Sequence, residues 1–329
     1  MSKRSINIAL CILVAILWGI LGLFIKLLDP LISPSYQVSV RYLVSLISYI
    51  LIMLITWTRG VGHVGAYYIT HVSYLRIGRI ALSNIIVIIL AAVVGFGISI
   101  PAFFLAVAYC GVYFTYIVGI GLTVIVTALL KVVTGSEMFT KYKLGYVTLL
   151  IIIIIITIII SKILTIGLTY VILFAVTWGA YLWLVGNINR PFKTFLEKLY
   201  STCIDMSISL LVGLISLTLF FHLNYSNILK YVILSFTSPY VFILMIVGIV
   251  LLCTVLPYII ICIVLSMDPT LVVNFSIIQY LEVILALMLG VFYFHELPLD
   301  LTTMMYMTFA VIGLVVCMVL RMREVSVSK

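Results

Sequence analysis

Charged residues are scarce in this chain of 329 residues: Asp, Glu, Lys and Arg together make up 8% of it, and only nine residues are acidic. Hydrophobic residues make up 66%, and the mean hydropathy is +1.41. Soluble domains contain about 25% charged residues, so this composition excludes a soluble domain as the main part of the chain. It predicts an integral membrane protein.

Common enzyme signatures are also absent. The chain has no H-E-x-x-H, G-x-S-x-G or G-x-x-x-x-G-K-[ST] segment, and its six cysteines form no C-x-x-C pair. The cysteines lie in or beside apolar runs, which is typical of small buried side chains and not of disulfides or metal ligands. We therefore predict no catalytic site, metal or cofactor, and direct drive by ATP from this chain is excluded.

Long apolar runs dominate the sequence instead. A helix needs about 20 residues to cross a bilayer, and the first run is too long for a typical signal peptide, so we expect an uncleaved helix there. The runs predict an all-α integral membrane protein with ten transmembrane helices, at residues 6–27, 36–57, 80–109, 112–133, 144–162, 164–186, 200–221, 240–266, 270–293 and 301–320.

The basic residues are distributed unevenly over the loops. With the N-terminus in the cytoplasm, only Lys26, Lys162 and Lys230 of the 18 lie on the far side, and Arg41 lies within a run. Cytoplasmic loops are enriched in Lys and Arg, so we expect a multi-pass protein of the plasma membrane with both termini cytoplasmic. The net charge of +9 then needs no nucleic-acid partner. The longest loop, residues 58–79, is aromatic and basic and is expected at the headgroup level.

The two halves of the chain echo each other at a nearly constant offset. Three matches occur in the same order: Trp18-Gly19 with Trp178-Gly179, Pro101 with Pro257, and Glu137 with Glu296. Because each half has five spans, the second half enters the membrane upside down. We therefore predict two inverted repeats, residues 1–162 and 163–329, which is the architecture of many secondary transporters.

These residues carry a resemblance to a known family. The chain resembles the drug/metabolite transporter superfamily, in its EamA branch of ten helices in two five-helix repeats, over about residues 6–320. The matching positions are Trp18-Gly19 and Lys26 in the first helix, Ser33-Pro34 and Arg41 leading into the second, Glu282 in the ninth, and Glu137 and Glu296 closing the fourth and ninth.

The resemblance implies transport of small organic solutes, often export of amino acids or other metabolites. One position departs from the pattern: members often have Glu-Pro in the ninth helix, and here the pair is Glu282-Val283. The kink that such a proline would introduce is therefore not expected from this sequence.

Glu282 lies inside a predicted span, where a carboxylate costs about 2.5–3.5 kcal/mol to insert. It is expected to face protein or water, and three interpretations stay open. It binds a substrate ammonium or a proton, it pairs with Arg41 or Lys26, or burial keeps it neutral and hydrogen-bonded. Gln279 lies one turn earlier on nearly the same face and extends the polar strip. Lys26 is close to its helix end and is expected to snorkel.

Arg41 and several aromatic residues complete the candidate substrate site. Arg41 either snorkels to the headgroups or binds a substrate carboxylate through its planar fork. Trp18 and Trp178 lie away from the span ends, so they serve either as packing residues or as aromatic walls of a cavity. Tyr116 and Tyr280 are further candidates for the lining.

The sequence thus predicts a secondary transporter that moves small organic metabolites, amino acids among them, by alternating access. Its partners are a small-molecule substrate and the lipid bilayer; a coupling proton or ion and the oligomeric state stay open. The alternatives are an integral membrane enzyme acting on lipid-linked substrates and a passive channel. Glu137 and Glu296 are expected to be solvated or capped loop acids with no role in transport.

Overall fold

The computed structural model describes residues 3–77, 80–135, 138, 140–161, 165–188, 192, 194–267 and 272–327. Within these ranges, nine helices are long and apolar enough to cross a membrane, and Gln279–Tyr293 is a shorter apolar helix. The prediction of a helical, multi-pass membrane protein is confirmed at this level. Glu137 lies outside the described residues.

The first half of the chain contains five helical segments of spanning length, several of them divided into pieces. In order they are α1 (Lys3–Gly19) with α2 (Leu21–Leu28), α3 (Pro34–Trp57), α5 (Asn84–Ala92) with η1 (Val93–Ser99) and α6 (Ile100–Cys110), α7 (Val112–Phe114) with η2 (Thr115–Ile120) and α8 (Gly121–Val133), and α9 (Lys141–Ser161). The segments labelled η are π-helical.

The second half follows a similar order. It contains α10 (Thr165–Gly186), α11 (Phe195–Phe220), α12 (Tyr225–Thr237), α13 (Pro239–Val241) with η3 (Phe242–Val255) and α14 (Leu256–Met267), α15 (Val272–Met288) with η5 (Leu289–Tyr293), and α16 (Leu301–Val327). Most of these boundaries lie within a few residues of the predicted apolar runs.

Two segments differ from the sequence-based expectation. Residues 58–79 were expected to be a loop, but they contain α4 (His63–Thr70) and β1 (Val72–Ile77), which pairs antiparallel with β2 (Ile80–Ser83). The third span therefore begins at Asn84 and not at residue 80. Hydropathy placed its start too early, because short apolar strands and helices have similar hydropathy. The short helix α12 was not predicted either. The described residues are otherwise helical or in turns and loops, so the prediction of an all-α membrane protein holds apart from this short hairpin.

Each π-helical segment η1 and η3 ends two residues before a proline. The last π-type bonds run from Ile100 N to Gly95 O, before Pro101, and from Leu256 N to Leu251 O, before Pro257. Proline has no N–H, and its ring clashes with the carbonyl four residues earlier. A wider turn moves that carbonyl aside, so both helices pass the proline without ending.

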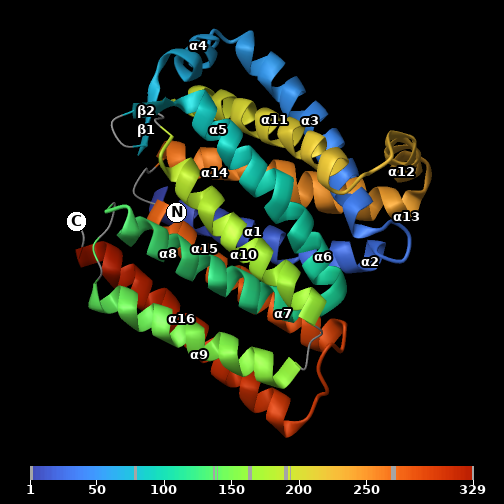
Figure 1. Ribbon diagram of the computed structural model, residues 1–329, viewed down its shortest axis with the longest axis vertical. Helices are drawn as coiled ribbons and strands as arrows, with labels where there is room; N and C mark the ends of the chain where they lie inside the picture. Colours follow the sequence, from blue (N-terminus) through green and yellow to red (C-terminus); the bar gives the residue numbers. More distant parts are fainter. Residues whose placement is uncertain are drawn as a thin grey trace.

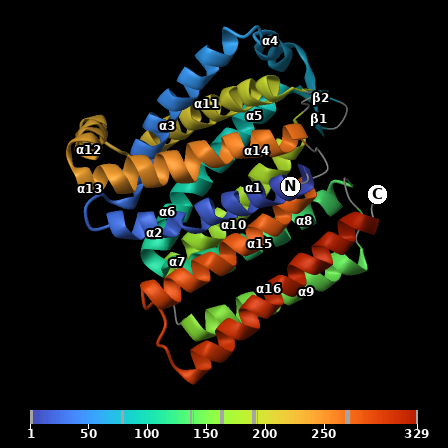
Figure 2. The same cartoon turned by 180° about the vertical axis from the view of Figure 1, so that it is seen from behind.

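Helix contacts between and within the halves recur in equivalent pairs. In each pair, the element of the first half is replaced by its counterpart in the second half, and the reverse. α1 packs against α15 as α10 packs against α8, and α3 lies beside η3 as α11 lies beside η1. Two further large contacts, α3 with α11 and α9 with α16, join equivalent elements of the two halves. Figure 1 and Figure 2 show α9 and α16 together at one edge of the bundle.

Glycine permits two of these equivalent contacts. A Cβ on Gly19 of α1 would lie 3.2 Å from the carbonyl oxygen of Glu282 on α15. A Cβ on Gly179 of α10 would lie 3.3 Å from the carbonyl oxygen of Thr123 on α8, and 2.7 Å from the side chain of Val126. Small residues let helix backbones approach closely in membranes, which gives the repeated Trp-Gly pair a physical role.

Both chain termini lie at the same end of the bundle, together with α4 and the β1–β2 hairpin (Figure 1). We call this end the terminal face. The ends of α2 and α6, the start of α7 and the helix α12 lie at the opposite face. Side chains on the outside of the bundle are strongly apolar: Ile159 of α9 is 69% exposed, whereas Ile153 on the same helix is fully buried. Lipid is the environment that such an outer surface requires.

Replacing Gly19 or Gly179 by Val is expected to destabilise the protein by about 1–3 kcal/mol, because the new side chain must push two helices apart. Gly186→Val is the matched control, since a Cβ on Gly186 meets nothing within 4 Å. Thermal unfolding in detergent would measure the effect. Equal unfolding temperatures for the three variants would contradict the close approach of these helices.

Candidate functional site

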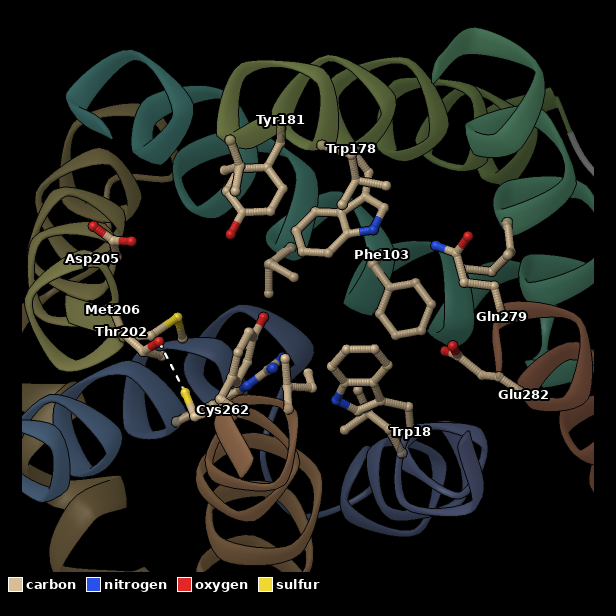
Figure 3. Close-up of a pocket in the computed structure, with 18 of the residues that line it drawn as sticks. Trp18, Phe103, Trp178, Tyr181, Thr202, Asp205, Met206, Cys262, Gln279 and Glu282 are labelled. Carbon is tan, nitrogen blue, oxygen red and sulfur yellow. Dashed lines mark hydrogen bonds between the residues drawn. The ribbon is translucent and has the colours of Figure 1, made fainter. Parts of the chain in front are cut away.

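A cavity of about 500 Å³ lies at the centre of the bundle, between the two halves of the chain. Small-molecule sites in proteins range from about 300 to 1,000 Å³, so this space holds a metabolite-sized ligand. α1, α3 and α6 of the first half and α10, α11, α14 and α15 of the second all contribute to the lining. Figure 3 shows the side chains converging from these helices.

Aromatic side chains form much of the wall. The rings of Trp178 and Tyr181 stack with centroids 4.5 Å apart, and Trp18 meets Tyr258 edge to face at 5.9 Å. Phe103 lies between the two tryptophans in Figure 3. Trp18 and Trp178 therefore line the cavity and also pack against its other aromatic residues, so their two predicted roles coincide. Flat apolar surfaces of this kind accept an apolar or aromatic portion of a ligand.

Arg41 is held inside the protein and does not snorkel. Its side chain lines the cavity although the residue is only 5% exposed. Its Nε donates to the hydroxyl of Thr254 at 2.9 Å, and its guanidinium lies 5.6 Å from the ring centroid of Phe104. The Thr254 hydroxyl in turn donates to Ile249 O at 2.7 Å within the π-helical η3. The buried Nη1 of Arg41 has no hydrogen-bond partner in the structure.

Glu282 and Gln279 project into the cavity from α15, next to each other (Figure 3). Glu282 is 8% exposed, and no ion pair links it to Arg41 or Lys26. Lys26 instead lies 3.7 Å from Glu296, so it does not snorkel freely as expected. The interpretation of Glu282 as half of a structural ion pair with Arg41 or Lys26 is therefore wrong. The cavity lining thus includes a guanidinium and a carboxyl group that form no ion pair with each other.

A second polar region was missed by the sequence analysis. Asp205 and Thr202 of α11 line the cavity on the side away from Glu282 and Gln279 (Figure 3). The Sγ of Cys262 on α14 donates to the Thr202 hydroxyl at 3.0 Å. Asp205 is an acid inside the predicted span 200–221, and that position was the available signal.

Two predicted lining residues lie elsewhere. Tyr116 is fully buried, and its hydroxyl donates to Trp18 O at 2.9 Å and accepts from Gly22 N at 3.2 Å. It thus satisfies backbone groups at the break between α1 and α2. Tyr280 is buried on α15 outside the lining. Neither tyrosine is among the residues that line the cavity, so the predictions that they line it are wrong.

The cavity reaches the terminal face but stops short of the opposite face. Val185 at the end of α10, together with Phe192 and Lys198 near the start of α11, brings the lining to the terminal face. The deepest lining residues, such as Arg41 and Phe103, lie about seven residues from the opposite ends of their helices. At 1.5 Å per residue, roughly 10 Å of packed protein closes the cavity on that side.

A scan of the chain against protein-family models found no match, and a search of the curated proteins found none either.

Replacing Tyr116 by Phe is expected to cost about 1–3 kcal/mol, because two buried backbone groups lose their partner. The variant leaves the lining of the cavity unchanged. Thermal unfolding in detergent would measure the loss, with Tyr109→Phe as the control because Tyr109 is 57% exposed. If the two variants unfold at the same temperature, Tyr116 does not hold the junction of α1 and α2.

Proposed function

We propose that this protein is a secondary transporter that carries small organic metabolites across the plasma membrane by alternating access. The observation that carries the proposal is the central cavity, which lies between the two halves and has a lining that extends to the terminal face but stops short of the opposite face. A site reachable from one side at a time is what alternating access requires. The packed layer of roughly 10 Å is what would have to open on the other side.

The arrangement of the helices supports an inverted repeat of five and five spans, with α15 and η5 counted as one span. The exchanged helix contacts, the π-helical turns before Pro101 and Pro257, and the glycines Gly19 and Gly179 all recur between residues 1–162 and 163–329. Two halves with nearly the same structure can exchange conformations, which opens the same site to the opposite face. These features also support the resemblance to the EamA branch of the drug/metabolite transporters.

The distribution of basic residues supports an orientation with the terminal face in the cytoplasm. The cavity then faces the cytoplasm in this structure. A transporter that rests in this state is ready to bind an internal solute for export, although a carrier can work in either direction. The direction of net transport is set by the substrate gradient or by a coupled proton or ion, because binding alone cannot pump.

Charges in the cavity favour a zwitterionic substrate, and an amino acid is the simplest example. The fork of Arg41 matches a carboxylate, and its Nη1 is buried without a partner. Glu282 in the same lining matches an ammonium group. Aromatic walls formed by Trp18, Trp178 and Tyr181 would cover the apolar part of the solute.

The two alternative functions fit the cavity less well. An enzyme acting on lipid-linked substrates needs acids and bases gathered at one membrane interface, but Asp205 and Glu282 lie on opposite sides of the cavity (Figure 3). A passive channel needs a path open to both faces, and this cavity is closed towards one. Saturable exchange distinguishes a carrier from a channel.

Counterflow into proteoliposomes preloaded with amino acids and related metabolites would test the function. We expect saturable accumulation of at least one labelled solute, and a decrease of tenfold or more in Glu282→Gln and Arg41→Ala. Arg41→Lys keeps the charge but loses the planar fork, so it should also be impaired. Arg59→Gln is the control, because Arg59 is exposed and outside the lining.

Unchanged counterflow in both Glu282→Gln and Arg41→Ala would show that the substrate site is assigned wrongly. Flux that does not saturate and shows no exchange would indicate that the protein is a channel and not a transporter. If no solute in the panel is exchanged by protein that is folded, lipid-linked substrates would be assayed next as the test of the enzyme alternative.

A further inference from the structure

The layer that closes the cavity towards the opposite face contains a buried carboxylate, Glu296. It lies after η5, in the connection to α16. Its Oε1 accepts the N–H of Val112 at 2.8 Å, and its Oε2 accepts the N–H of Tyr113 at 3.0 Å. These N–H groups open the helical span Val112–Val133, so the acid of one half binds the start of a helix in the other half.

Glycines on both sides shape the space for this carboxylate. Gly111 has φ +83°, and a Cβ there would lie 2.5 Å from Oε1 of Glu296. A Cβ on Gly290, in η5, would lie 2.7 Å from Oε2. Any larger residue at either position would displace the carboxylate, so the local backbone of both halves is built around it.

Lys26 adds a third element to the cluster. Lys26 lies at the end of α2, and its Nζ is 3.7 Å from Oε1 of Glu296. The side chains of Lys26 and Glu296 are 30% and 10% exposed. The cluster of Lys26, Gly111, Val112, Tyr113 and Glu296 therefore joins α2 and α7 of the first half to the η5–α16 connection of the second. We call these five residues the Glu296 cluster.

The cluster lies directly beyond the closed end of the cavity. Leu21, which lines the cavity, is on α2 with Lys26, and Ile120, which also lines it, is on the span that begins at Val112. The segments on either side, η2 and η5, are π-helical. A movement that opens the cavity between α2, α7 and η5 would break the Glu296 contacts.

Another contact between the halves at this face is weaker. Asn227 of α12 donates to the hydroxyl of Tyr36 at 3.1 Å, and the rings of Tyr36 and Tyr231 lie 4.9 Å apart. That contact is neutral and its hydrogen bond is exposed. Hydrogen bonds to a charged group are roughly twice as strong as neutral ones, so Glu296 makes the stronger cross-connection.

Burial raises the pKa of the Glu296 carboxyl above its ordinary value, although the N–H groups of Val112 and Tyr113 and the ammonium of Lys26 act in the opposite direction. The charge is thus costly to bury and depends on these three partners. A carboxylate that loses them must reach water or another donor, which makes the closed and open arrangements two distinct states.

We propose that Glu296 is the latch that keeps the cavity closed towards the opposite face, by binding the start of α7 and Lys26 of α2. The inference deepens the proposed function, because alternating access is the reason this face must open. It differs from the sequence-based expectation that Glu296 is a capped loop acid with no role in transport.

Sided cysteine labelling tests the latch without any transport assay. Ile120→Cys places a thiol at the closed end of the cavity, in a Cys110→Ala and Cys262→Ala background that removes the native cysteine beside Gly111 and the one in the lining. A membrane-impermeant maleimide is then added from each side of the membrane. We expect labelling from the terminal face only, and at least tenfold faster labelling from the opposite face once Glu296 is replaced by Gln.

Asp300→Asn is the matched control, because Asp300 is an acid of the same connection that accepts the N–H of Thr303 at 2.7 Å and lies outside the Glu296 cluster. Its labelling should equal that of the parent protein. Lys26→Met should increase labelling from the opposite face by a smaller factor, and should add little in the Glu296→Gln background, because the two residues act through one contact. This second variant tests the latch even if Glu296→Gln does not fold.

Unchanged labelling from the opposite face in folded Glu296→Gln, with only a lower unfolding temperature, would reduce Glu296 to a helix cap and overturn the latch. Equal labelling from both faces in the parent protein would overturn it too, because the face would then not be closed. One-sided labelling that depends on Glu296, combined with no counterflow of any solute, would refute the proposed transport and leave the latch standing.

Discussion

Backbone polar groups within a membrane must find partners inside the protein, and this constraint shapes the irregular parts of the structure. At several interruptions a side chain from elsewhere supplies a missing bond. Tyr116 bridges the break between α1 and α2, Tyr49 of α3 donates to Thr254 O of η3 at 3.3 Å, and Glu296 binds the free N–H groups at the start of α7. The interruptions surround the cavity, so the irregular backbone and the candidate site depend on the same long-range contacts.

The charged residues of the cavity are also held by contacts between distant parts of the chain. Arg41 is fixed by Thr254, which itself satisfies η3, so the π-helical turn before Pro257 indirectly positions the positive group of the cavity. Glu282 is positioned by α15, whose close approach to α1 depends on Gly19. Each charge is thus held by a contact between the two halves, and a movement of one half relative to the other necessarily changes the cavity.

Composition and periodic hydropathy predicted the multi-pass helical class and nearly all helix ends, because lipid imposes a length and an apolar surface on each span. The candidates Arg41, Glu282, Gln279, Trp18 and Trp178 do line one cavity, since polar or large aromatic residues inside apolar runs are few. Tyr116 and Tyr280 could not be assigned correctly, because a tyrosine serves equally well in a lining or in packing. The β1–β2 hairpin, α12 and the position of Asp205 depend on tertiary contacts that a single sequence does not record.

The pair of α9 and α16 lies at the edge of the bundle, away from the cavity. In the described part of the chain, no residue of either helix lines the cavity. The two sides of this pair therefore meet different physical requirements. Outward side chains of α9 such as Ile159 face lipid and need only be apolar. Inward positions also need a fixed shape and partner, because Ile153 is fully buried and the Thr157 hydroxyl lies 2.9 Å from the Tyr306 hydroxyl of α16.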